Sequence, residues 1–235
     1  MLEWKDLCAQ LFPAGHSVAQ AGEVLSGNGR LGEQEVAVIG TVGHAAIGAD
    51  IALQLSQAVL RVMHDHPQRP ILMLVDTQGQ RLSRRDELLG NNAYLAHLAK
   101  CFAVARQRGH RLISVVYSEA VSGGFLAFGM MADATYAVPL AQIRVMALPA
   151  MARITKLPLE QLEALCRTSA ILGPGVDNFV ALGAVEAIWD QPFDNCLRQA
   201  LAECNTTDGR RTSGAARGGR TAADAIARLV REYQE

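Results

Sequence analysis

The most informative stretch of the chain is Pro70-Ile71-Leu72-Met73-Leu74-Val75-Asp76, in which five consecutive apolar residues stand between a proline and an aspartate. A strand that is apolar at every position is typical of a parallel sheet covered on both faces. A second run of this kind, Arg111 to Tyr117, follows a helical pattern over residues 84–108. Strands that alternate with helices predict an α/β fold with a mostly parallel sheet flanked by helices.

Weaker patterns extend this alternation in both directions. Upstream, they predict a strand at 35–39 and a helix from about Gly48 to Pro67. Downstream, they predict a helix at 125–131, a strand at 134–138, helices at 157–168 and 176–184, and a last strand at 185–189. We expect one domain over residues 1–204. The polar, Gly- and Arg-rich residues 205–220 predict a flexible linker or loop, and residues 221–235 predict a C-terminal helix.

Composition excludes several classes of protein. The 235 residues are 50% hydrophobic and carry a net charge of −1, so no basic field is present to hold a nucleic acid. The five cysteines form no C-x-x-C pair, which predicts neither a disulfide framework nor a metal site. The longest apolar stretch, 125–132, is far shorter than the ~20 residues of a membrane helix. The N-terminus lacks the apolar core of a signal peptide. We therefore expect a cytoplasmic protein with no nucleic-acid or membrane partner.

Three motifs match known sites in letters but not in context. Gly27-x-Gly29-x-x-Gly32 fits the dinucleotide fingerprint, yet it precedes a predicted strand instead of following one, so we interpret it as a loop. His64-Asp65-His66 suggests a metal, but residues two apart do not share a helix face, and a solvated helix end is favoured. Gly15-His16-Ser17 sets a histidine beside a serine, the two residue types of a hydrolase site, but it lacks the Gly-x-Ser-x-Gly elbow of that class.

Two glycine-containing turns follow the two buried strands. Asp76-Thr77-Gln78-Gly79-Gln80 is predicted as a loop after the first strand, and Ser122-Gly123-Gly124 opens a helix after the second. The carboxyl ends of parallel strands meet at one edge of the sheet, where α/β proteins place their sites. A glycine pair at a strand-to-helix turn exposes backbone N–H groups that can form an oxyanion hole. A tight turn packed against a neighbouring strand is an equally good explanation of the pair alone.

The order of motifs resembles a known family over roughly residues 35–190. It is similar to the carboxyltransferase branch of the crotonase superfamily, and within it to the gamma subunits of biotin-independent malonate decarboxylases. The motifs are Leu74-Val75-Asp76-Thr77-x-Gly79, Glu87-Leu88-Leu89-Gly90, Val121-Ser122-Gly123-Gly124-Phe125, Ala132-Asp133-Ala134-Thr135-Tyr136-Ala137-x-Pro139, Ala141-Gln142-Ile143-Arg144-Val145-Met146 and the glycine-rich 40–48. The resemblance implies a ClpP/crotonase-like, carboxyltransferase-type domain.

The resemblance also implies a function and partners. In that family the gamma subunit pairs with a beta subunit. Together they convert a malonyl thioester to the acetyl thioester and carbon dioxide. The substrate is carried on the phosphopantetheine-type (CoA-derived) arm of an acyl carrier protein, so an acyl carrier protein subunit and an acyl-carrier-protein transferase subunit are further expected partners. A site shared between two such domains predicts that this chain alone is inactive.

The implied site lies on the two glycine turns. The catalytic residues would be Gly123, Gly124 and Phe125, whose amides hold an oxyanion or the departing carboxylate. The substrate-binding residues would be Thr77, Gln78, Gly79 and Ser122. Gln78 stands where carboxylases have a proline, and Ser118, Glu119, Val121 and Ser122 replace their usual basic residues and tyrosine. We therefore expect no biotin and no directly bound cofactor.

Two other functions stay open. One is a self-sufficient crotonase-type acyl-CoA hydratase or thioesterase, which needs a carboxylate beside the glycine pair, and Glu119 and Glu87 are the nearby candidates. The other is a non-catalytic partner that completes the beta subunit's site. The basic residues of the predicted linker could attract an acidic carrier protein, although a solvated linker is favoured. These residues are Arg210, Arg211, Arg217 and Arg220.

Overall fold

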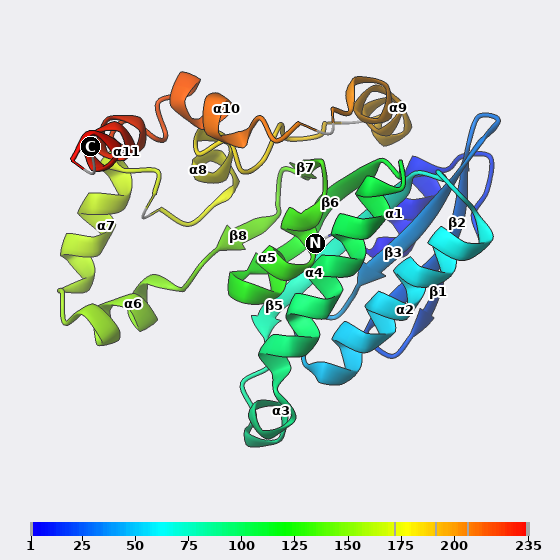
Figure 1. Ribbon diagram of the computed structural model, residues 1–235, viewed down its shortest axis with the longest axis horizontal. Helices are drawn as coiled ribbons and strands as arrows, with labels where there is room; N and C mark the ends of the chain where they lie inside the picture. Colours follow the sequence, from blue (N-terminus) through cyan, green and yellow to red (C-terminus); the bar gives the residue numbers. More distant parts are fainter. Residues whose placement is uncertain (1, 172, 191, 206, 234–235) are drawn as a thin grey trace.

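Two ten-residue strands, β5 (Ile71–Gln80) and β6 (Leu112–Val121), run parallel to each other at the centre of the sheet. The computed structural model describes residues 2–171, 173–190, 192–205 and 207–233 (Figure 1). Residue 206 of the expected linker and residues 234–235 of the expected terminal helix therefore lie outside the described residues. The first seven residues of β5 are buried, as the apolar run predicts.

The described sheet has the order β1-β2-β3-β5-β6-β7. The flanking strands on this path are β1 (Ala19–Ala21), β2 (Val24–Leu31), β3 (Gln34–Thr41) and β7 (Ala134–Ala137). Pairs β1–β2 and β2–β3 are antiparallel, whereas β3–β5, β5–β6 and β6–β7 are parallel. The expectation of a mostly parallel sheet is confirmed, with an antiparallel extension at one edge.

Each central strand changes partner halfway along its length. β5 pairs first with β3 and then with β4 (Ala45–Ile47), and β6 pairs first with β7 and then with β8 (Gln142–Arg144). The expected loop at 76–80 is therefore wrong, because these residues continue strand β5. Apolar periodicity does not reveal this second half, since its hydrogen bonds come from two three-residue strands that carry no strong pattern of their own.

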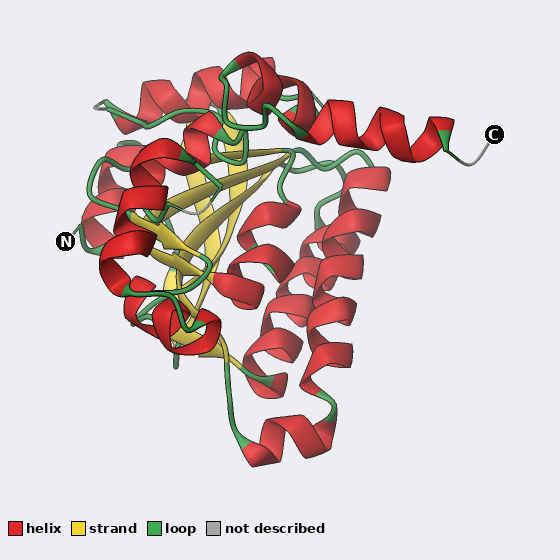
Figure 2. Cartoon of the chain, turned by 90° about the vertical axis from the view of Figure 1, so that its left-hand side faces the viewer, coloured by secondary structure: helices red, strands yellow, loops and turns green. Residues whose placement is uncertain are grey.

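Helices cover both sides of the strands (Figure 2). The long helices α2 (Ala49–Asp65) and α4 (Asn91–Gln107) pack against each other, and α1 (Trp4–Leu11) packs against α9 (Phe193–Glu203). The single helix expected over 84–108 is two helices, because Gly90 in the left-handed conformation (φ 75°) separates α3 (Arg84–Leu89) from α4. Within the part of the chain that the structure describes, no helix is long and apolar enough to cross a membrane.

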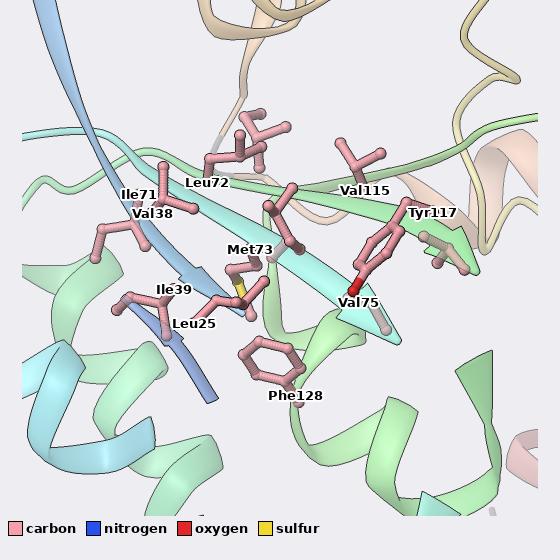
Figure 3. Packing of buried hydrophobic residues seen from close by; sticks show 14 of the residues in the cluster. Leu25, Val38, Ile39, Ile71, Leu72, Met73, Val75, Val115, Tyr117 and Phe128 are labelled. Atoms are coloured by element: carbon pink, nitrogen blue, oxygen red, sulfur yellow. The ribbon is translucent and has the colours of Figure 1, made fainter. Parts of the chain in front are cut away.

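The core lies between the central strands and the helices, and its side chains come from both faces of β5 (Figure 3). Leu72, Met73 and Phe128 are fully buried. Phe128, which follows α5, packs at a tilt against Phe102 of α4, with the ring centroids 5.7 Å apart.

The glycine motif near the N-terminus lies in a strand. Gly27 and Gly29 are part of β2, which pairs antiparallel with β3, so the loop that we expected there is wrong. A Cβ atom on Gly29 would lie 2.4 Å from the ring of Phe12, which shows that this glycine admits an aromatic side chain. The rejection of dinucleotide binding agrees with this placement, since no helix begins at the motif.

Most of the helices that follow β8 lie away from the sheet, whereas α9 returns to pack against α1 (Figure 1). Besides α9, these helices are α6 (Leu148–Thr155), α7 (Leu159–Thr168), α8 (Val176–Ala181), α10 (Arg210–Ala216) and α11 (Ala223–Glu232). Residues 185–189, expected as a last strand, do not form a regular strand, but they run beside β7. Ile188 forms a bridge with Ala137, and the Glu186 and Trp189 N–H groups donate to the Thr135 and Ala137 carbonyls at 2.7 and 2.8 Å. The expected terminal helix corresponds to α11, whose apolar side chains Ile226, Leu229 and Val230 are exposed.

The segment 205–220 is not irregular throughout, contrary to expectation. Residues 210–216 form α10, in which Gly214 is buried. Arg210 donates a hydrogen bond to the Ala132 carbonyl at 2.6 Å, and Arg217 pairs with Glu186 at 2.9 Å. Local glycine content predicts a linker here, but long-range hydrogen bonds from arginines stabilise the helix against the domain. Both arginines therefore make contacts with the domain, although Arg217 is also exposed to solvent.

Candidate active site

The two glycine turns predicted as the site meet at the ends of β5 and β6. Helix α5 (Ser122–Ala127) begins directly after β6, and Ser122 at the junction has a left-handed backbone (φ 50°). A Cβ atom on Gly124 would lie 2.6 Å from the carbonyl carbon of Gly79, so the two backbones touch. Only glycine permits this approach, and it brings the predicted residues of both turns into one place.

A glutamine that the sequence analysis missed completes this turn. The Gly123 N–H donates a hydrogen bond to Gln80 Oε1 at 3.0 Å. A Cβ atom on Gly123 would lie only 2.8 Å from the same oxygen. The N–H of Gly123 therefore points at a position occupied by a carbonyl-type oxygen, the acceptor that a thioester also offers. Gln80 could have been suspected because it immediately follows Gly79. The sequence analysis predicts a loop there, and a loop prediction does not say where a side chain points.

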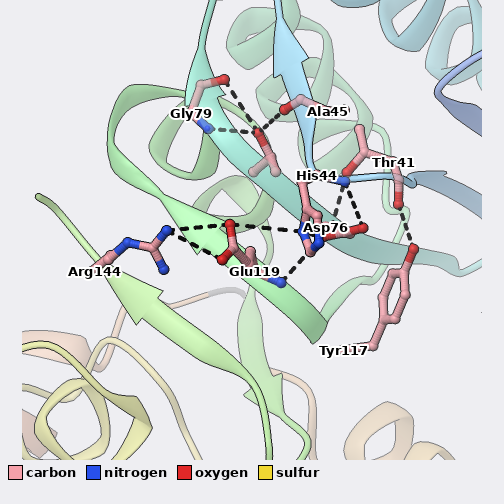
Figure 4. Close-up of polar contacts among 9 residues, drawn as sticks. Thr41, His44, Ala45, Asp76, Gly79, Tyr117, Glu119 and Arg144 are labelled. Atoms are coloured by element: carbon pink, nitrogen blue, oxygen red, sulfur yellow. Dashed lines mark hydrogen bonds and ion pairs between the residues drawn. The ribbon is translucent and has the colours of Figure 1, made fainter. Parts of the chain in front are cut away.

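The predicted substrate-binding residues differ in accessibility. Thr77 is buried, and its hydroxyl donates to the Ala45 carbonyl at 2.6 Å and accepts from the Gly79 N–H at 3.0 Å (Figure 4). Thr77 thus holds the backbone of the turn in place. Gln78 is exposed. The Phe125 ring is buried and packs at a tilt against Phe179, with the ring centroids 6.4 Å apart.

A second cluster lies beside these turns, around the buried carboxylate of Asp76 (Figure 4). The Asp76 carboxylate accepts from the His44 backbone N–H at 2.9 Å and lies 2.8 Å from His44 Nδ1. The Glu119 N–H donates to the same carboxylate at 3.2 Å. The pairing of β5 with β6 is irregular between Val75 and Thr77, and such a bulge redirects side chains at the end of a strand.

Glu119 and Arg144 extend this cluster outward. Arg144 Nη2 lies 3.2 Å and 3.3 Å from the two Glu119 oxygens, and Glu119 Oε2 lies 3.8 Å from His44 Nδ1. In the sequence analysis Glu119 is a candidate for the carboxylate of a hydratase. In the structure its carboxylate forms an ion pair with Arg144. Glu87, the other candidate, is exposed on α3. The members of the cluster are up to 100 residues apart in sequence (from 44 to 144), so no local motif reveals them.

The wall behind Asp76 is rigid and polar. Asp76 N–H donates to the Thr41 hydroxyl at 3.1 Å, and the Tyr117 hydroxyl donates to the Thr41 carbonyl at 2.9 Å. Burial first, and the charge of Asp76 second, raise the pKa of Tyr117 well above its usual value, so this phenol stays protonated. Among the described residues, no group of three or more His, Cys, Asp or Glu side chains is placed to hold a metal ion.

The fold defines the class of protein. This chain has a crotonase-like, carboxyltransferase-type fold. Its TM-score to transcarboxylase 12S is 0.68 over 84% of this chain and 40% of that one, at 21% identity. The model of the malonate decarboxylase gamma subunit family matches residues 43–234. The chain therefore belongs to the malonate decarboxylase gamma subunit family.

Individual relatives agree with this assignment. The chain is 26% identical to a chain of a Pseudomonas malonate decarboxylase hetero-tetramer in complex with coenzyme A, with a TM-score of 0.80 over 97% of both chains. It is also similar in fold to a Pseudomonas malonate decarboxylase MdcD–MdcE hetero-dimer (24% identity, TM-score 0.76, 92% of both chains). A curated relative, the malonyl-S-ACP:biotin-protein carboxyltransferase MADD of Malonomonas rubra, is 29% identical over 75% of this chain and 68% of the relative.

Proposed function

We propose that this chain, together with a beta subunit, decarboxylates a malonyl thioester on an acyl carrier protein without biotin. Carbon dioxide leaves, one proton is taken up and the acetyl thioester is released. Membership of the gamma subunit family supports the reaction, and the hetero-tetramer and hetero-dimer of the Pseudomonas relatives support a heteromeric enzyme. The coenzyme A complex of one relative supports a CoA-derived substrate arm, and no further cofactor is required.

The chemistry requires stabilisation of an enolate. When the carboxylate leaves as carbon dioxide, negative charge develops on the thioester oxygen. Backbone N–H groups fixed in a dry site stabilise that charge, and loss of one such donor typically costs about 3–4 kcal/mol. The glycine turn supplies these donors, and we assign them to Gly123, Gly124 and Phe125, with Thr77, Gln78, Gly79 and Ser122 forming the facing wall.

The observation that carries this proposal is the contact of Gly124 with Gly79 beside the Gly123 hydrogen bond. It fixes an N–H at the carboxyl edge of the sheet, directed at a carbonyl-type oxygen of Gln80. A substrate oxygen that displaces Gln80 Oε1 would meet a donor already in place. Such preorganisation is what oxyanion stabilisation requires.

A second candidate function is carboxyl transfer to a biotin-carrying protein. The relative MADD favours it, because its name specifies a biotin-protein acceptor. Two features of the chain oppose it. Gln78 stands where carboxylases have proline, and the residues before the glycine pair include Glu119, whose carboxylate is paired with Arg144. An acceptor therefore has to be tested directly.

The deciding experiment compares three preparations on malonyl-loaded acyl carrier protein. They are this chain alone, the beta subunit alone and the co-expressed pair, together with the acyl carrier protein and acyl-carrier-protein transferase subunits. We expect acetyl thioester only from the pair, with no effect of excess avidin. Turnover by this chain alone would favour a self-sufficient crotonase-type enzyme. Loss of turnover with avidin, or dependence on an added biotinylated protein, would favour carboxyl transfer.

A further inference from the structure

The proposed reaction needs a proton for the enolate carbon, and the glycine turn contains no group that could deliver one. Its peptide N–H groups are hydrogen-bond donors, not acids at neutral pH. The cluster around Asp76 lies at the same edge of the sheet and has no assigned task. The cluster includes His44, and histidine is the side chain that most often transfers protons in general acid–base catalysis.

His44 is held in one orientation by two contacts with a single carboxylate. Its ring Nδ1 lies 2.8 Å from Asp76 Oδ1, and its backbone N–H donates to Asp76 Oδ2 at 2.9 Å. The Asp76 side chain is only 6% exposed, whereas that of His44 is 40% exposed. A histidine whose Nδ1–H is engaged by a buried carboxylate presents its other nitrogen, Nε2, for proton transfer.

The position of His44 connects it to the glycine turn. His44 immediately precedes Ala45, which pairs with Thr77 across β4 and β5. The Thr77 hydroxyl bridges the Ala45 carbonyl and the Gly79 N–H, and Gly79 is the residue that Gly124 touches. A short chain of contacts, which runs through the Thr77 hydroxyl, thus connects the histidine to the predicted oxyanion site.

The backbone of His44 is in an unusual conformation that supports a functional role. Its φ of 53° lies in the left-handed region, which a non-glycine residue adopts at a cost. Glycine precedes it at position 43, and the N–H bond to Asp76 holds the turn. Strain of this kind collects at sites where a side chain must point in one direction.

The charged groups that face His44 suit the task. Among the described residues, His44 forms ion pairs with Asp76 and with Glu119, whose Oε2 lies 3.8 Å from Nδ1. Arg144 pairs with Glu119 and balances its charge. Both carboxylates lie on the Nδ1 side of the ring, so neither of them engages Nε2.

We propose that His44 is the acid that protonates the enolate and that Asp76 is its positioning residue; this assignment rests on the proposed decarboxylation. The Nε2–H bond of the imidazolium breaks, and the electron pair of the enolate carbon–carbon double bond forms the new C–H bond. The product is the acetyl thioester. The neutral imidazole regains a proton from water at its exposed edge.

Two substitutions at one position separate this chemistry from a structural role. In His44→Asn the amide nitrogen can replace Nδ1 as the donor to Asp76, and asparagine tolerates a left-handed backbone. In His44→Gln the amide reaches toward the Nε2 position but carries no transferable proton. In the co-expressed complex, we expect both variants to lose about 10²–10⁴-fold in kcat with KM changed by less than about threefold.

Exchange of hydrogen isolates the proton-transfer step. In D2O, the wild-type complex should exchange the methyl hydrogens of an acetyl thioester for deuterium, because the reverse of protonation uses the same acid and base. The His44→Asn and His44→Gln complexes should lose this exchange. Asp76→Asn should lower kcat by about tenfold or more in the wild-type background but have no further effect on kcat in His44→Asn. That non-additivity is the expected signature of a residue acting through His44.

The outcomes distinguish the two proposals. A wild-type complex that decarboxylates while His44→Asn retains its kcat and its exchange would overturn the assignment of His44 and leave the proposed function standing. A wild-type complex without decarboxylation overturns the proposed function and this assignment with it. Thermal unfolding of each variant complex confirms that lost turnover is not lost folding.

Discussion

Two glycine-rich stretches of this chain look alike in sequence and differ in what their glycines permit. In β2, Gly29 makes room for the ring of Phe12, a side chain of the N-terminal segment. At the start of α5, Gly124 makes room for the backbone of Gly79 at the end of β5. The first glycine serves packing on the flank of the sheet, and the second brings two turns together at the edge where parallel strands end.

The comparison shows that the spacing of glycines is a weaker signal than their place in the topology. The β2 stretch fits a dinucleotide fingerprint letter by letter but lies in an antiparallel strand. The α5 stretch matches no such fingerprint but stands at a strand-to-helix turn. Only the second position leaves backbone donors at the end of a strand, where a ligand can reach them.

The largest expected effect is that of Gly124→Ala. Its methyl group would lie 2.6 Å from the Gly79 carbonyl carbon, so the turn must open and the N–H donors must move. We expect kcat of the complex to fall by about 10²-fold or more, comparable to removal of an oxyanion donor. Co-elution with the beta subunit should be retained. Turnover within a few-fold of wild type would place the oxyanion site elsewhere.

Gly29→Ala is the matched substitution in the other stretch. Its methyl group would lie 2.4 Å from the Phe12 ring, so overpacking should lower the free energy of unfolding by about 1–3 kcal/mol. Decarboxylation per folded complex should not change. Chemical denaturation measures the free energy of unfolding, and an activity assay well below the unfolding temperature measures decarboxylation. A loss of kcat in the folded complex would contradict the different roles given to Gly29 and Gly124.

Gln80→Glu sharpens the assignment of the Gly123 N–H. A carboxylate accepts a stronger hydrogen bond than an amide and repels an anionic substrate. We expect kcat/KM for the malonyl thioester to fall by about tenfold, mainly through KM. Gln57→Glu, an exposed change of the same charge on α2, is the control. Equal effects of the two substitutions would contradict displacement of Gln80 by substrate.

The smallest expected effect is that of a substitution at Asp86, whose carboxylate contacts a third glycine turn at Gly48, and it concerns the pH dependence of unfolding. The Asp86 carboxylate accepts from the Ser83 hydroxyl and from the Ala49 N–H at 3.0 Å, and these bonds lower the pKa of Asp86. A depressed folded-state pKa contributes stability above the unfolded value of about 3.9, and that contribution is lost as pH falls through the folded value. Asp86→Asn should therefore flatten the dependence of unfolding midpoint on pH below about 4. A dependence equal to that of wild type would contradict the lowered pKa of Asp86 in the folded state.

Much of the fold follows from local pattern. The apolar runs in β5 and β6 predict buried parallel strands, and Pro67 marks the end of helix α2. The predicted site residues on the two glycine turns lie together in the folded chain. Their catalytic and binding roles stay predictions, because the backbone geometry identifies donors but not the substrate atom that each donor meets.

Other elements depend on contacts that no window of sequence contains. Strands β4 and β8 are three residues long and exist because they pair with the far halves of β5 and β6. Helix α10 forms in a Gly- and Arg-rich segment because Arg210 and Arg217 reach distant acceptors. The cluster of His44, Asp76, Glu119 and Arg144 comes from four separate elements or turns.

Local sequence thus specifies where this chain is apolar, where it turns and where glycine leaves the backbone bare. Those properties depend on near neighbours, since burial periodicity and conformational freedom act over a few residues. The folded chain adds which bare amides face a carbonyl oxygen and which carboxylate holds the histidine. These depend on strand order and register, because a hydrogen bond forms only where two distant segments are brought within about 3 Å.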